Sequence, residues 1–75
     1  MIWHTWFDAF EAHLFEIGFV FAGETPEGTR VYDRGDVVCS VKGRPGGTIT
    51  AMEMERACNE AGIEPPADIE QFFGD

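Results

Sequence analysis

The sequence predicts a two-layer α+β domain of order α-β-β-β-α, with two helices on one face of a three-stranded antiparallel sheet. Three observations lead to this prediction. Apolar residues at helical spacing occur near both ends, three short alternating segments lie between them, and Gly- or Pro-rich turns separate these segments. Strands joined by such short turns must be antiparallel. The 75 residues suit a single domain, 1–75.

The first helix is predicted over residues 5–17. Apolar residues that recur at spacings of three and four share one of its faces: Trp3, Phe7, Phe10, Leu14 and Ile17. Thr5 is the expected N-cap and Gly18 the expected left-handed stop. Trp6 and Phe15 lie off the apolar face. The helix therefore either packs on two sides or presents aromatic side chains to a partner.

Three strands are predicted over residues 19–22, 29–34 and 37–42. Alternate residues of a strand point to opposite faces. We therefore expect Val31, Cys39 and Val41 to pack against the helices. The other set would form an open polar face of the sheet: Arg30, Tyr32, Arg34, Ser40 and Lys42.

The second helix is predicted over residues 51–61. Thr50 and Glu53 have the spacing of a capping box at its start. Gly62 is expected to end it in the left-handed conformation. The tail, 64–75, contains apolar residues at helical spacing that predict a short helical turn: Ile69, Phe72 and Phe73.

Charge is unevenly distributed along this acidic chain, whose net charge is −9. Residues 1–28 carry −5, residues 29–49 carry +2 and residues 50–75 carry −6. One interpretation is that the acidic helices only keep a small protein soluble. The other is that their carboxylates imitate phosphates and attract a protein that normally binds nucleic acid. Direct binding of nucleic acid or of a membrane is disfavoured, because the net charge would repel either polyanion.

No catalytic constellation is evident, and we expect neither enzymatic activity nor a metal or other cofactor. His4 and His13 lack the spacing of a metal site, and Ser40 is the single serine. Cys39 and Cys58 fall on predicted core positions, where thiols are inert. Two cysteines, no signal peptide and no apolar run of membrane-spanning length predict a cytoplasmic protein, in the host cytoplasm if a phage encodes it.

Four short motifs resemble those of HicA-type mRNA-interferase toxins, which have a fold like that of double-stranded-RNA-binding domains. The matching stretches cover about residues 8–63, and they are Ile17-Gly18-Phe19, Gly28-Thr29-Arg30, Gly46-Gly47-Thr48-Ile49 and Ala61-Gly62-Ile63. The resemblance implies that Arg30 stands where that family has its catalytic histidine. An arginine cannot act as a general base near neutral pH, so the resemblance implies a scaffold without the RNA chemistry.

The leading hypothesis is a small acidic inhibitor that binds the basic nucleic-acid-binding surface of a partner protein or complex. By type it is similar to phage anti-CRISPR and anti-restriction proteins. The acids expected to contact the partner are Asp8, Glu11, Glu16, Glu53, Glu60, Glu64, Asp68 and Glu70. The first alternative is a divergent RNA-binding domain of a toxin-antitoxin system that uses Arg30, Tyr32 and Lys42.

The second alternative is a dimeric accessory or antitoxin-like protein. It would bury Trp6, Phe15 and Phe72 between two copies. The basic and aromatic residues expected at a sheet-face or dimer contact are Arg30, Tyr32, Arg34 and Lys42.

Overall fold

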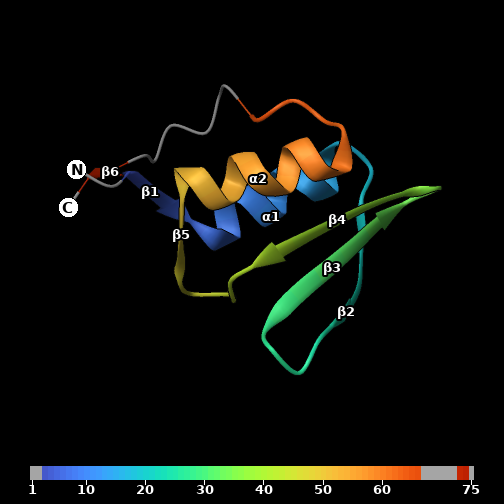
Figure 1. Cartoon of the computed structure of the whole chain (residues 1–75), viewed down its shortest axis with the longest axis horizontal. Helices are drawn as coiled ribbons and strands as arrows, with labels where there is room; N and C mark the ends of the chain where they lie inside the picture. The colour runs from blue at the N-terminus through green and yellow to red at the C-terminus, as the bar shows by residue number, and fades with distance from the viewer. Residues whose placement is uncertain (1–2, 67–72, 75) are drawn as a thin grey trace.

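The computed structural model describes residues 3–66 and 73–74, and it confirms the α+β fold. Helices α1 (Phe7–Glu16) and α2 (Ala51–Ala61) cover one face of a three-stranded antiparallel sheet (Figure 1). The strands of this sheet, in spatial order, are β2 (Val20–Glu24), β3 (Thr29–Arg34) and β4 (Val37–Lys42). The predicted bounds of the second helix and of the last two strands agree with α2, β3 and β4.

A second, small sheet lies at the other end of the molecule and is not predicted from the sequence. It contains β1 (Trp3–Trp6) between β5 (Thr48–Thr50) and β6 (Phe73–Gly74). β1 continues directly into α1 and β5 directly into α2, so one antiparallel ladder joins the starts of both helices (Figure 1). Phe73, predicted as part of a helical turn, instead belongs to β6 and pairs with His4. Ile69 and Phe72, the other residues of that predicted turn, lie outside the described residues.

The small sheet explains why α1 begins at Phe7 and not near Thr5. Thr5 pairs with Ile49 in the ladder and is fully buried, so it cannot act as the N-cap. The loop before β5 satisfies the start of α1 instead. The Phe7 amide donates to the Gly47 carbonyl at 3.0 Å, and the Gly46 amide donates to the Asp8 carboxylate at 3.1 Å.

The start and the end of α2, and the end of α1, agree with the predicted caps better than the start of α1 does. The Thr50 hydroxyl accepts from the Glu53 amide at 3.1 Å, which confirms the N-cap of α2. Gly62, with φ of +74°, ends that helix in the left-handed conformation. At the end of α1, the Phe19 amide turns back to the Leu14 carbonyl at 2.9 Å. Phe19 is thereby buried in the core, and the first sheet strand starts one residue later than predicted.

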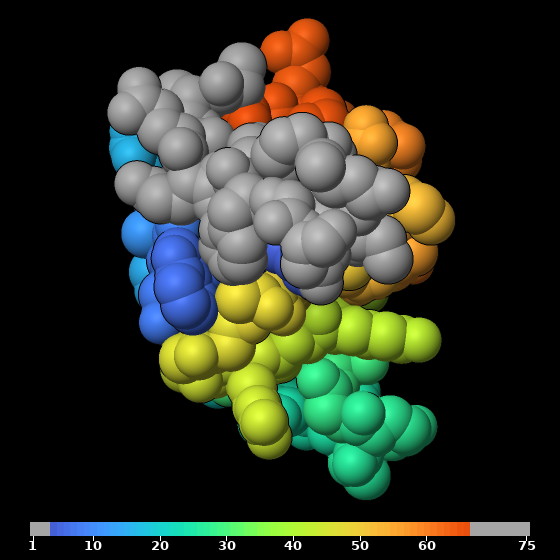
Figure 2. All heavy atoms as spheres, turned by 90° about the vertical axis from the view of Figure 1, so that its left-hand side faces the viewer, coloured from blue at the N-terminus to red at the C-terminus, as the bar shows by residue number. Residues whose placement is uncertain are grey.

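The core lies between the helices and the inner face of the larger sheet. Its buried residues are Phe7, Phe10, Leu14, Phe19, Tyr32, Cys39, Val41, Ile49, Met54, Ala57 and Cys58. Four large aromatic rings in so short a chain provide much of the apolar area that a small domain needs. Seen from the end that carries the small sheet, residues 42–50, in yellow-green and yellow, lie between the helices above and the β2–β3 turn below (Figure 2).

The prediction for the faces of β3 is wrong by one residue. Tyr32 pairs with Cys39 and Arg30 pairs with Val41, so these residues share the face that the helices cover. Val31 pairs with Ser40 on the outer face. The open polar face expected for Arg30, Tyr32 and Arg34 does not exist, because Tyr32 is fully buried and Arg30 is largely covered.

The two edges of the larger sheet are different. β2 pairs with β3 on one side only, and its register shifts between Phe21 and Gly23, which leaves Ala22 as an extra residue. Such a bulge disrupts the ladder and bends the edge strand. At the opposite edge, α2 lies along β4 (Figure 1).

Candidate functional site

Glu11, one of the acids expected to contact a partner, is bound inside the chain by two residues of β3. The Tyr32 hydroxyl donates to Glu11 Oε2 at 2.6 Å, and Arg30 donates to the same oxygen at 3.3 Å. Arg30 Nε also donates to the Tyr32 hydroxyl oxygen at 3.1 Å. Both charged side chains are largely covered, with exposed fractions of 15% for Arg30 and 17% for Glu11. This cluster joins α1 to β3 and engages Arg30 and Tyr32, the residues that the RNA-binding alternative would use.

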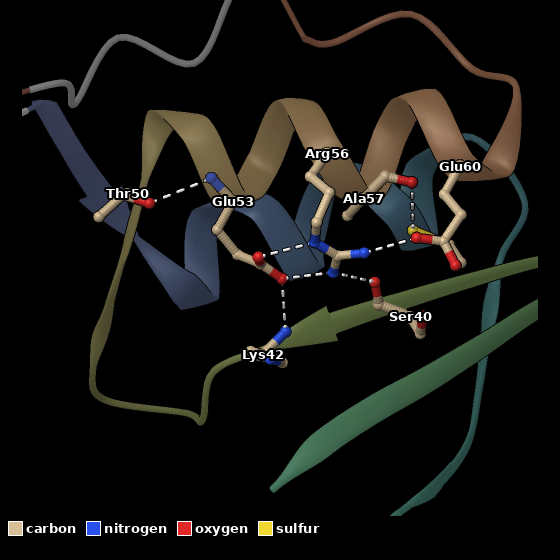
Figure 3. A network of polar contacts seen from close by, with 8 residues as sticks. Ser40, Lys42, Thr50, Glu53, Arg56, Ala57 and Glu60 are labelled. Atoms are coloured by element: carbon tan, nitrogen blue, oxygen red, sulfur yellow. Dashed lines mark hydrogen bonds and ion pairs between the residues drawn. The ribbon is translucent and has the colours of Figure 1, made fainter.

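Glu53 and Glu60, two further predicted contact acids, bind Arg56 of α2 (Figure 3). Arg56 reaches Glu53 and Glu60 at 2.6 Å each and donates to the Ser40 carbonyl at 3.2 Å. Glu53 in turn accepts from the Lys42 amide at 2.9 Å. Hydrogen-bonded Arg56 lowers the pKa of Glu53, and hydrogen-bonded Glu53 raises the pKa of Arg56. The network occupies backbone groups at the edge of β4 that would otherwise be open to another strand.

The remaining predicted contact acids have different environments. Asp8 is exposed but accepts from the Gly46 amide, whereas Glu16 and Glu64 are exposed and form no ion pair with the described residues. Asp68 and Glu70 lie outside the described residues. Glu55, which sequence reasoning omitted, is exposed on α2 and likewise has no ion-pair partner in the described part of the chain.

A surface formed by α1 and β2 combines exposed aromatic rings with carboxylates, and we call it the aromatic-acid surface. It consists of Glu11, Phe15, Phe21 and Glu24, which Tyr32 and Arg30 connect, and it includes the exposed Glu16 that follows Phe15 in α1. Phe15 and Phe21 are 47% and 44% exposed. Each packs in edge geometry on the buried Tyr32 ring, with centroid distances of 6.0 and 5.7 Å. Phe15 is predicted from the sequence to lie off the apolar face, but neither Phe21 nor Glu24 is selected, because no face is assigned to the first predicted strand and that strand is predicted to end at residue 22.

Arg34 and Lys42, the other residues expected at a sheet-face contact, lie apart. Arg34 donates to the Ile17 carbonyl at 3.1 Å, and its guanidinium lies 4.8 Å from the centre of the Phe19 ring. It therefore packs over the C-terminal end of α1. It also borders a surface depression with His13 and Glu64. Lys42 borders a second depression with Arg44, Glu24 and Glu27. Its two sides, the green β2–β3 turn and the yellow-green segment after β4, lie together at the bottom of Figure 2.

The polar clusters of this chain have the chemistry of structural contacts. Burial and the Glu11 carboxylate raise the pKa of Tyr32 to about 12, so this hydroxyl stays protonated near neutral pH. Burial also raises the pKa of the Cys39 thiol and raises that of Cys58 to about 11, which keeps both sulfurs protonated and unreactive. Within residues 3–66 and 73–74, no three His, Cys, Asp or Glu side chains are grouped so that they could hold a metal ion.

Comparison with protein-family models, curated proteins and solved structures finds no match to this chain. Neither α1 nor α2, the helices of the described part, is long and apolar enough to cross a lipid bilayer.

Proposed function

We propose that this chain is a non-enzymatic inhibitor that acts in the cytoplasm by binding the basic, nucleic-acid-binding surface of a partner protein. The observation that carries the proposal is the excess of carboxylates without an internal cation. The described part contains eleven acidic residues, of which Glu11, Glu24, Glu53 and Glu60 form ion pairs. The other seven form none with any residue of this described part. The negative charge therefore remains available to attract a basic partner.

The chain's own cations support this view. Arg30 and Arg56 are used in ion pairs, and Arg34 is used at the end of α1. Lys42 and Arg44 form no ion pair with the described residues, but they border a depression that also contains Glu24 and Glu27. A chain of net charge −9 with three of its four arginines engaged internally is a poor ligand for RNA. This disfavours the alternative of an RNA-binding domain built on Arg30 and Tyr32.

Four of the acids form ion pairs within the chain, so fewer carboxylates are available to contact a partner. Carboxylates held by arginine in the folded chain are partly neutralised, so they attract a partner less than unpaired ones do. We therefore assign the main electrostatic attraction to Glu16 of α1, Glu55 of α2 and Glu64, which follows the end of α2.

The experiment starts with capture of proteins from the native host on the immobilised chain, and its readout uses the purified partner. We expect the chain to displace a labelled nucleic acid from that partner in a mobility-shift assay. We also expect its affinity for the partner to fall steeply between about 50 and 200 mM salt, because exposed charges are screened. A partner that keeps its nucleic acid at saturating chain, or an affinity independent of salt, would overturn the proposal.

A matched pair of double variants controls for net charge. Glu16→Gln with Glu55→Gln removes two carboxylates of the helices, whereas Glu27→Gln with Asp36→Asn removes two from turns. Both change the charge by the same amount. The helical variant should weaken displacement more strongly than the turn variant. Equal effects would show that only overall acidity matters, which contradicts docking through the helical layer.

A further inference from the structure

The aromatic-acid surface is unusual because two large rings are half exposed on a chain whose core is small. Phe15 belongs to α1 and Phe21 to β2, and the buried Tyr32 ring lies against both. Glu11, one helical turn before Phe15, holds the Tyr32 hydroxyl at 2.6 Å and so fixes the ring on which both phenylalanines pack. Exposed aromatics held on a rigid base are typical of binding surfaces, where they contribute contact area at a small entropic cost.

The charges around these rings are predominantly negative. Glu16 follows Phe15 in the sequence and is exposed without an ion-pair partner in the described residues. Glu11 and Glu24 share the single cation Arg30, at 3.3 and 3.7 Å. Three carboxylates and one guanidinium leave this surface with a net charge of −2. The surface is thus complementary to a cationic group that also has a flat face to place on an aromatic ring.

The chain already contains one example of such recognition. The Arg30 guanidinium lies 4.2 Å from the centre of the Phe21 ring while it binds Glu11 and Glu24. Arginine stacks on aromatic rings and binds carboxylates in a fixed planar geometry, which the compact and strongly hydrated lysine ammonium does not reproduce. Phe15 and Glu16 are consecutive residues of α1 and both are exposed, so a ring and an unpaired carboxylate remain open to the outside there.

We propose that the aromatic-acid surface binds arginine side chains of a basic protein segment, with Phe15 and Phe21 as the ring contacts and Glu16 as the main free carboxylate. This inference rests on the proposed function and specifies where on the chain the partner docks and which residue type it presents. A second copy of the chain is a poorer occupant, because two surfaces of the same negative charge repel each other.

The test compares two peptide probes, eight arginines and eight lysines, in calorimetric titrations of the intact chain and its variants. We expect the arginine peptide to bind several-fold more tightly than the lysine peptide. Phe15→Leu and Phe21→Leu, which keep apolar bulk but remove the ring, should each weaken the arginine peptide roughly three- to fivefold, the range for an exposed cation–π contact. They should leave the lysine peptide nearly unchanged.

Matched controls separate the surface from general acidity and from folding. Glu16→Gln should weaken the arginine peptide more than Glu27→Gln, although both remove one exposed carboxylate. Met52→Leu changes a 78% exposed apolar residue of α2 and should have no effect. Glu16→Gln keeps the test decisive if a phenylalanine variant fails to fold. Equal binding of the two peptides, or equal effects of Glu16→Gln and Glu27→Gln, would overturn the inference.

The same variants distinguish failure of the inference from failure of the proposed function. If Phe15→Leu and Phe21→Leu displace nucleic acid from the purified partner as well as the parent chain does, the inference is wrong and the proposed function stands. If the arginine preference and its loss in these variants are observed but no nucleic acid is displaced, the surface is assigned correctly and the inhibitor function is wrong. Sedimentation of the chain alone tests self-association, and a dimer disrupted by Phe15→Leu would overturn the assignment to a basic partner.

Discussion

The Tyr32 hydroxyl donates to Glu11 at 2.6 Å, and this hydrogen bond joins β3 to α1. Because of it, the free energy of unfolding should decrease at alkaline pH. Burial, followed by the Glu11 acceptor, raises the pKa of Tyr32 from 10.0 to about 12 in the folded chain. The folded chain therefore retains the proton after the unfolded chain has lost it. The stabilisation is fully present below about pH 10 and is lost as the pH rises through about 12.

We predict that Tyr32→Phe lowers the free energy of unfolding at pH 7 by about 1–3 kcal/mol, the range for a hydrogen bond to a charged group. Urea unfolding between pH 8 and 12 should show a smaller alkaline loss for the variant than for the parent chain. Parallel pH profiles of the two proteins would contradict the role assigned to this hydroxyl.

Arg56→Met should destabilise the chain by about 1–2 kcal/mol, a value kept low because the guanidinium is partly exposed and screened. The substitution removes the donors to Glu53, Glu60 and the Ser40 carbonyl but retains the apolar stem. Arg44→Met, which removes a cation without an ion pair in the described residues, is the matched control and should change stability by less than about 0.5 kcal/mol. Thermal unfolding measures both, and equal effects would argue against the Arg56 network.

Acid should weaken the same network through Glu53. Arg56, then the Lys42 amide, lowers the pKa of Glu53 below its ordinary 4.5. The contribution of Glu53 is therefore complete above about pH 4.5 and is lost as the pH falls through the lower, folded-state pKa. Glu53→Gln should reduce stability at pH 7 and flatten its decline between pH 5 and 2, as followed by circular dichroism. A variant with an unchanged acid slope would exclude this carboxylate as a cause.

Gly43 provides a prediction about packing. A Cβ at this position would lie 2.6 Å from Phe7 Cδ2 and 2.8 Å from Ile49 Cγ2, closer than van der Waals contact allows. Gly43→Ala should therefore cost about 1–3 kcal/mol. Chemical denaturation measures this loss, and a neutral Gly43→Ala would mean that Phe7 and Ile49 can move apart.

The two thiols should react only when the chain unfolds. Cys39 and Cys58 are fully buried, and burial raises the pKa of both. At pH 7.5 we expect labelling by a disulfide reagent to proceed at the rate of unfolding, and to become fast for both thiols in concentrated urea. Fast modification of either cysteine without denaturant would show that the core opens locally.

Much of the fold was predictable because local chemistry determines it. Thr50 and Gly62 define α2 at both ends, and the two-residue turn at Gly35 and Asp36 defines the β3–β4 hairpin. The same turn also determines which residues of β3 face the helices, and the prediction from hydrophobicity did not take it into account. A two-residue turn pairs Arg34 with Val37, so even-numbered residues of β3 must share a face with odd-numbered residues of β4. Counting pairs from the turn would have placed Tyr32 beside Cys39, whereas hydrophobicity alone favoured Val31.

The small sheet could not be predicted for a different reason. β1 and β5 are short and far apart in the sequence, and their pairing is stabilised by tertiary contacts rather than by a local signal. Thr5 has the residue type of an N-cap but becomes a buried strand residue, since Ile49 lies opposite it. The aromatic-acid surface likewise depends on the bulge at Ala22. No residue pattern in β2 predicts this bulge.

Both edge strands of the larger sheet, β2 and β4, are poorly suited to pair with a strand from another chain. Ala22 distorts the hydrogen-bonding pattern along β2, and Arg56 with Glu53 occupies backbone groups of β4. A donor strand from another polypeptide therefore finds no regular template on either edge of the larger sheet. At these two edges, recognition has to proceed through side chains and not through an added strand.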